Sequence, residues 1–148
     1  MAVDKKATLT YVQLMKEDLA VFRLVPEDGV IPDYETGQFI TLGLPIPSED
    51  NKIIRRAYSI ASHPENKKFI ELVIRWVRKP LPGRVTTALF NSGEGHEVSW
   101  LPPTGNALLI NEKLADGTKD DRRIVCVGGG TGIAPFMAFA RHLHAIGD

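Results

Sequence analysis

The feature that most constrains the fold of this chain is a series of short segments in which apolar and polar residues alternate. Alternation with a period of two is typical of half-buried β-strands, and turn residues such as Gly, Pro, Asn and Asp separate the segments. The segments predicted as strands cover residues 7–14, 19–25, 38–44, 53–60, 69–77 and 97–101. Six strands with short connections predict a closed antiparallel barrel, because closure removes exposed strand edges.

Two further segments have helical rather than alternating patterns. Residues 84–90 carry apolar side chains at helical spacing and are predicted to form one small helix after the fifth strand. The charged residues 116–122 end the barrel pattern, and residues 123–127 then form a short apolar run typical of a buried parallel strand. A glycine-rich turn over 128–132 leads to a helix predicted over 133–146, so the end of the chain has the order of a dinucleotide-binding unit.

The composition excludes several classes of function. The chain has 148 residues, 24% of them charged, with a formal net charge of zero, which argues against a nucleic-acid-binding or membrane-surface protein. Its single cysteine, Cys126, excludes an internal disulfide framework and a cysteine-ligated metal cluster, and we expect it to be a small core residue. No apolar run is long enough to span a bilayer and no signal pattern is present, so we expect a cytoplasmic protein without a metal.

The predicted fourth strand carries side chains suited to a nucleotide cofactor. Arg56 offers a planar fork of donors that matches a phosphate, Tyr58 a flat ring with a hydroxyl, and Ser59 a small donor or acceptor. These groups together fit a ligand that combines a phosphate with a flat heteroaromatic ring. Taken alone, the segment could equally be an ordinary strand with a surface arginine and a half-buried tyrosine.

Two other segments have the chemistry of a phosphate site. Gly83 precedes the predicted helix 84–90, and a helix N-terminus presents free N–H groups and a partial positive charge. The glycines at 128–132 would let the backbone approach a phosphate closely. Plain helix capping and a tight turn without a ligand are the alternatives. If Arg56 and the helix start hold two phosphates of one pyrophosphate, the cofactor is FAD rather than FMN.

These motifs occur in the order typical of the ferredoxin–NADP⁺ reductase superfamily, and the chain resembles its bacterial ferredoxin/flavodoxin reductase branch. Residues 56–59 match its flavin motif, residues 83–86 are similar to its second phosphate motif, and residues 130–135 resemble the opening of its nicotinamide domain. The resemblance implies a mainly β fold. It consists of a six-stranded antiparallel Greek-key FAD-binding barrel with one small helix, followed by the first strand and helix of an α/β nucleotide-binding domain.

The resemblance also implies a role for each matching residue. Arg56 would bind the FAD pyrophosphate, while Tyr58 would pack on the isoalloxazine and Ser59 would hydrogen-bond near its N5, so these last two are the expected catalytic residues. The other implied cofactor-binding residues are Ala57, Val73, Arg84, Val85, Thr86, Gly130, Thr131 and Gly132. No residue is expected to bind a metal.

The implied activity is electron transfer between NAD(P)H, FAD and a one-electron carrier, namely an iron–sulfur protein or flavodoxin. The alternatives are a reductase component or electron-transfer subunit of an oxygenase or other complex, and a non-catalytic flavin-binding module. We expect the barrel domain to cover residues 1–118 and the start of an NAD(P)-binding domain to cover 119–148. Because that second domain would be incomplete, this chain alone is expected to hold flavin but to be a poor NAD(P)H oxidoreductase.

Overall fold

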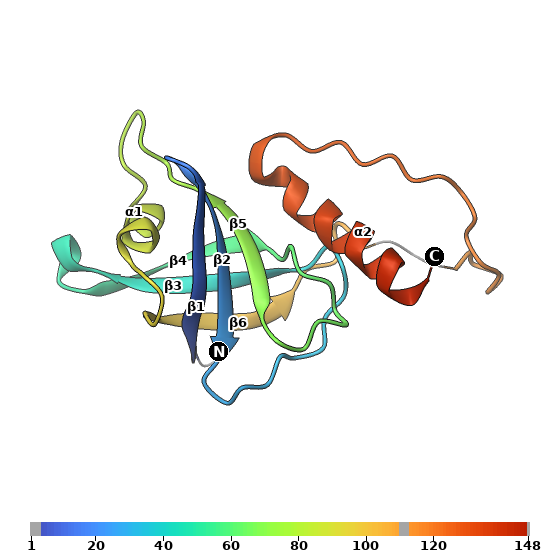
Figure 1. The fold of residues 1–148 in the computed structure, drawn as a ribbon, viewed down its shortest axis with the longest axis horizontal. Helices are drawn as coiled ribbons and strands as arrows, with labels where there is room; N and C mark the ends of the chain where they lie inside the picture. The colour runs from blue at the N-terminus through green and yellow to red at the C-terminus, as the bar shows by residue number, and fades with distance from the viewer. Residues whose placement is uncertain (1–3, 110–112, 148) are drawn as a thin grey trace.

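The computed structural model describes residues 4–109 and 113–147, which form an antiparallel sheet of six strands with two α-helices (Figure 1). All six predicted strands and the small helix are confirmed. The strands are β1 (Lys5–Lys16), β2 (Leu19–Pro26), β3 (Phe39–Ile46), β4 (Lys52–Ser59), β5 (Ile70–Arg75) and β6 (Glu97–Thr104). The helices are α1 (Arg84–Asn91) and α2 (Ala134–Ile146), with short 3₁₀ turns η1 (Pro47–Glu49) and η2 (Gly130–Ile133).

The strand order is β4-β3-β6-β1-β2-β5, and every neighbouring pair is antiparallel. β6 inserts between β1 and β3, which gives the Greek-key crossing expected for this barrel. β4 and β5 are the two outer strands of the sheet. Just beyond β4, the backbone N–H of Ala61 donates to the backbone oxygen of Glu71 in β5 at 2.8 Å. This bond closes the barrel at one end.

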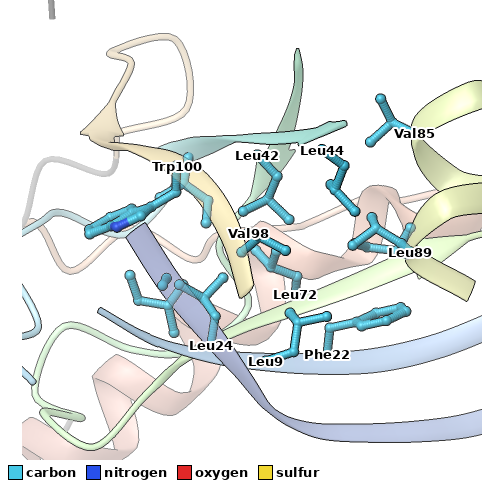
Figure 2. Close-up of a cluster of buried hydrophobic side chains, with 14 of the residues drawn as sticks. Leu9, Phe22, Leu24, Leu42, Leu44, Leu72, Val85, Leu89, Val98 and Trp100 are labelled. Carbon is cyan, nitrogen blue, oxygen red and sulfur yellow. The ribbon is translucent and has the colours of Figure 1, made fainter. Parts of the chain in front are cut away.

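The barrel interior is filled by the inward-facing side chains of all six strands (Figure 2). β2 shows the principle most clearly, because its residues alternate strictly between buried and half-buried positions. Leu9, Phe22, Leu42 and Leu72 are fully buried in the centre, and burial of one such side chain contributes about 1.5–3 kcal/mol. α1 covers one end of the barrel with Val85 and Leu89, so the core fixes the position of this helix.

The C-terminal segment is built differently. Residues 123–127, predicted as a buried strand, form no strand, and the whole stretch 121–130 is exposed. The prediction was wrong because a parallel strand takes its hydrogen bonds from neighbouring strands. No segment within 4–109 or 113–147 pairs with it. Cys126 is accordingly exposed, and the prediction that it belongs to a core was also wrong.

α2 lies beside the barrel, against the side that carries β5 (Figure 1). It begins at Ala134 with Pro135 in its first turn, as expected, and Gly147 ends it in the left-handed conformation. The buried side chains are Ala134, Pro135, Ala138 and Phe139. Ala140 is exposed, because the barrel covers only one face of the helix. None of the helices described is long and apolar enough to cross a membrane.

Candidate functional site

A cavity of about 580 Å³ opens where β4 and β5 do not pair, next to the start of α1. Its size is within the range usual for small-molecule and cofactor sites. Three segments that are distant in the sequence meet there: β4, the end of β5 with the start of α1, and the turn η2. The lining residues are Arg56, Ala57, Tyr58, Val73, Ile74, Arg75, Val77, Gly83, Arg84, Val85, Thr86 and Thr131.

Most residues predicted to bind the cofactor lie in this lining. They are Arg56, Ala57, Tyr58, Val73, Arg84, Val85, Thr86 and Thr131. Three predicted residues lie outside it. Ser59 is half-buried at the last position of β4, and Gly130 and Gly132 are exposed in η2 on either side of Thr131.

Arg56 is an exposed cation at the cavity without a carboxylate partner in the described part of the chain. Its Nη1 donates only to the backbone oxygen of its neighbour Arg55, at 2.7 Å. Arg55, by contrast, forms an ion pair with Asp4 and does not line the cavity. The strand alternation therefore directs one arginine to a protein partner and leaves the next available for an anionic ligand.

Tyr58 is half-buried and packs against the barrel core while also lining the cavity. Burial raises the pKa of its hydroxyl to about 12, and the nearby positive charge of Arg56 opposes this rise only partly. The hydroxyl is therefore protonated at neutral pH. The side chain offers the cavity a flat aromatic face and a neutral hydrogen-bond donor.

The start of α1 leaves its first-turn N–H groups without a side-chain cap. The hydroxyl of Thr86 donates to the backbone oxygen of Gly83 at 3.2 Å and accepts from the N–H of Val77 at 3.3 Å. A Cβ at Gly83 would lie 2.6 Å from this hydroxyl, so only glycine fits there. Thr86 thus ties the helix start to the chain beyond β5, and the uncapped N–H groups form a site for an anion.

The remaining cations at the cavity are already paired. Arg84 Nη1 donates to both carboxylate oxygens of Glu49 in η1, at 2.8 and 3.0 Å. Nε of Arg75 lies 3.6 Å from Oδ2 of Asp18. Arg75 lines the cavity but was not predicted to belong to the site. The sequence could have indicated it, because the period of two places Val73, Arg75 and Val77 on one face of the strand. Three guanidinium groups therefore surround the cavity, and Arg56 is the one without an acidic partner within residues 4–109 and 113–147.

No group of three or more His, Cys, Asp or Glu side chains in the described residues is arranged to hold a metal ion. The donors at the cavity include guanidinium and backbone N–H groups, which bind phosphate rather than metal cations. A cavity of this size that combines hydrogen-bond donors for phosphate with an aromatic face fits FAD. The fold and the site thus define a flavin-nucleotide-binding barrel.

The comparison with protein families agrees with this class. The model of the oxidoreductase FAD-binding domain family matches residues 6–108, and the chain belongs to this family. The matched range includes β4, β5 and the start of α1, and so nearly all of the cavity lining.

Individual relatives are more distant. The electron transfer subunit of dihydroorotate dehydrogenase B (NAD(+)) from Streptococcus pneumoniae is 27% identical over 128 residues, which are 86% of this chain and 46% of that subunit. The FAD/NAD-binding domain of nitric oxide dioxygenase from Vibrio cholerae has a TM-score of 0.81 at 22% identity, with 96% of this chain and 57% of that one covered. Ferredoxin-NADP⁺ reductase from Plasmodium falciparum has a TM-score of 0.72 at 19% identity, with 96% and 53% covered.

The two solved structures confirm the predicted fold, and the family match confirms the predicted FAD-binding domain. The chain spans less than half the length of several curated relatives that it matches, including the subunit from Streptococcus pneumoniae.

Proposed function

We propose that this chain is the FAD-binding part of a flavin-dependent oxidoreductase that passes electrons between NAD(P)H and a one-electron carrier. The observation that carries the proposal is the cavity between β4, β5 and α1, which combines the unpaired Arg56, the aromatic Tyr58 and an uncapped helix start. Bound FAD would supply the redox chemistry, namely hydride uptake and release of single electrons, while the protein would bind, orient and shield it.

In this proposal the two phosphates are held by different parts of the site. The guanidinium of Arg56 binds one, and the N–H groups of Arg84, Val85 and Thr86 in the first turn of α1 bind the other. The Arg84 side chain is engaged with Glu49, so its backbone rather than its guanidinium is the expected donor.

We propose that the ring system is held by neighbouring residues of β4 and β5. Tyr58 would pack on the isoalloxazine, with Ala57 and the backbone of Val73 lining it. Ser59, which lies next to Tyr58 but outside the cavity lining, would hydrogen-bond near N5. Thr131 reaches the cavity from η2, and we propose that the nicotinamide approaches there, beside Gly130 and Gly132.

The partner that exchanges single electrons is proposed to be an iron–sulfur protein or a flavodoxin. A second candidate is an electron-transfer subunit of a larger enzyme, which is favoured by the similarity to the subunit from Streptococcus pneumoniae. The proposed division into a barrel over 1–118 and an NAD(P)-binding part over 119–148 is supported by the family match, which ends at residue 108. The cytoplasmic location stays a prediction.

The test begins with an absorption spectrum of the purified protein and chromatography of the flavin released on denaturation. FAD is expected, and FMN alone would contradict the proposed two-phosphate site. Anaerobic mixing with NADPH and with NADH then follows reduction of the bound flavin. A flavin that neither nucleotide reduces in the intact protein would contradict the oxidoreductase and leave a flavin-binding module.

A further inference from the structure

Glu71 in β5 is the buried charged residue of the described ranges, at 3% exposed, and it does not line the flavin cavity. Each of its carboxylate oxygens is bonded to a different arginine. Oε2 accepts from Nε of Arg23 at 2.8 Å, and Oε1 accepts from Nη1 of Arg141 at 2.6 Å. Burial of an ionised carboxylate costs free energy unless the carboxylate is paired and hydrogen-bonded. Both arginines therefore stabilise the packing of the chain around Glu71.

The two arginines come from different parts of the molecule. Arg23 lies opposite Glu71 in the β2–β5 ladder, and its guanidinium packs between the rings of Tyr11 and Phe69, at 4.5 and 4.2 Å. The barrel therefore supplies this partner from within its own sheet. Arg141 lies on α2, 70 residues after Glu71. The second oxygen of the carboxylate is thus bonded only when α2 lies against the barrel.

Burial alone would raise the pKa of the Glu71 carboxyl, but hydrogen bonds from Arg141 and Arg23, with the charges of these arginines, hold it below its usual 4.5. The carboxylate is therefore ionised at neutral pH and can bind both cations at once.

Arg141 also contacts the segment that follows the flavin motif. Its Nη1 donates to the backbone oxygen of Ala61 at 3.0 Å, two residues after Ser59. Ala61 and Ser62 are themselves bonded to Glu71, through the Ala61 N–H to the Glu71 backbone oxygen and the Glu71 N–H to the Ser62 hydroxyl. One side chain of α2 is therefore bonded to both strand ends at the point where the barrel closes.

The N-terminus of α2 follows the turn that lines the cavity. Arg141 is seven residues from Ala134, the first residue of the helix, which is about 10 Å along a rigid helix axis. Thr131, three residues before Ala134, lines the flavin cavity. A helix fixed at Arg141 and packed through Ala134 and Ala138 therefore fixes where Thr131 lies.

We propose that Glu71 and Arg141 are positioning residues: the ion pair between the half-exposed Arg141 and the buried Glu71 clamps α2 to the barrel and so holds Thr131 at the flavin cavity. The inference rests on the proposed function, in which the nicotinamide approaches at Thr131. Neither residue lines the flavin cavity. They act through α2, and a displacement of the order of 1 Å at a reacting site can slow transfer by about a hundredfold.

The test compares Arg141→Gln with Arg122→Gln, a matched control whose arginine pairs only with nearby Asp120. Amide hydrogen exchange of the whole chain is followed by mass spectrometry. In Arg141→Gln, exchange in 130–146 is expected to rise about tenfold while the strands of the barrel stay protected, and in Arg122→Gln neither changes. Arg141→Lys keeps the charge but loses the planar fork, so its exchange in 130–146 is expected to lie between the rates of these two variants. Unchanged exchange in 130–146 of Arg141→Gln would overturn the clamp.

A second pair of measurements separates positioning from plain stability. In Arg141→Gln the FAD affinity is expected to stay within about twofold. The rate of flavin reduction by NAD(P)H, slow in this chain and compared with wild type at the same NAD(P)H concentration, is expected to fall about tenfold. Arg23→Gln, which removes the partner within the barrel, is expected to lower the melting temperature and the FAD affinity together. If Arg141→Gln behaves like Arg23→Gln, the pair is a stabilising element and the proposal is wrong. If the wild-type flavin is not reduced at all, the proposed function fails, while the exchange measurement still decides the clamp.

Discussion

The barrel and the C-terminal segment of this chain both carry apolar segments predicted as strands, but these segments lie in very different environments. In the barrel, every strand pairs with a neighbour and Leu72 is fully buried. In the C-terminal segment, Val125 and Val127 are 84% and 87% exposed. An apolar run therefore becomes a buried strand only where partner strands are available. The barrel contains all its partners, whereas residues 123–127 have none in the described ranges.

The largest expected effect comes from a matched pair of truncations in the two regions. Leu72→Ala leaves a cavity in the barrel core and is expected to lower the free energy of unfolding by about 2–5 kcal/mol. Val125→Ala removes an exposed side chain and should change it by less than about 0.5 kcal/mol. Urea denaturation followed by circular dichroism measures both. Equal losses would mean that residues 123–127 are packed, contrary to the structure.

Within the barrel, a substitution at the cavity should weaken FAD binding without lowering the stability of the cofactor-free protein. Arg56→Ala removes a charge-assisted bond of about 1.5–3 kcal/mol and is expected to weaken FAD binding ten- to a hundredfold. The stability of the cofactor-free protein should change little, because Arg56 is exposed and bonds only to its neighbour. Arg55→Ala is the control, since Arg55 pairs with Asp4. An FAD titration in which both variants bind alike would remove Arg56 from the site.

The helix start provides a comparison between two glycines. A Cβ at Gly83 would collide with the Thr86 hydroxyl, so Gly83→Ala is expected to cost about 1–3 kcal/mol and to weaken FAD binding as the first turn of α1 shifts. Gly93 has open space around its Cα, and Gly93→Ala should be nearly neutral. Thermal unfolding with and without FAD checks both. Normal FAD binding in Gly83→Ala would argue against a phosphate site at α1.

The smallest expected effect is seen in the titration of the Tyr58 hydroxyl. Burial raises the pKa of Tyr58 from 10.0 to about 12, so its contribution to stability is complete below pH 10 and is lost as the pH rises toward 12. Burial also raises the pKa of Tyr34 to about 12, so absorbance near 295 nm in the cofactor-free protein should show a late step from both tyrosines. Tyr58→Phe should reduce the size of this step by about half, and the Tyr34 half remains as an internal reference. A Tyr58 step near pH 10 would mean that the hydroxyl is solvent-exposed.

The sequence allowed the barrel to be predicted because each strand carries its own alternating pattern and each site motif is local. Arg56, Tyr58 and Thr86 could be placed at one site by their motifs alone. The period of two also places Arg75 on the strand face of Val73, but Arg75 is not part of a recognised motif and was therefore not predicted. The pairs Arg84–Glu49 and Arg141–Glu71 could not be predicted, because their members are 35 and 70 residues apart and meet only once the barrel has closed.

The central claim is that the cavity between β4, β5 and α1 holds both phosphates of FAD. The most direct measurement is a titration of the cofactor-free protein with FAD, FMN and riboflavin, followed by flavin fluorescence. Because Arg56 and the start of α1 each bind a phosphate, affinity should fall stepwise from FAD to FMN to riboflavin, by about tenfold or more at each step. Equal affinities for FAD and FMN would contradict the account, because the second phosphate would then have no partner in the protein.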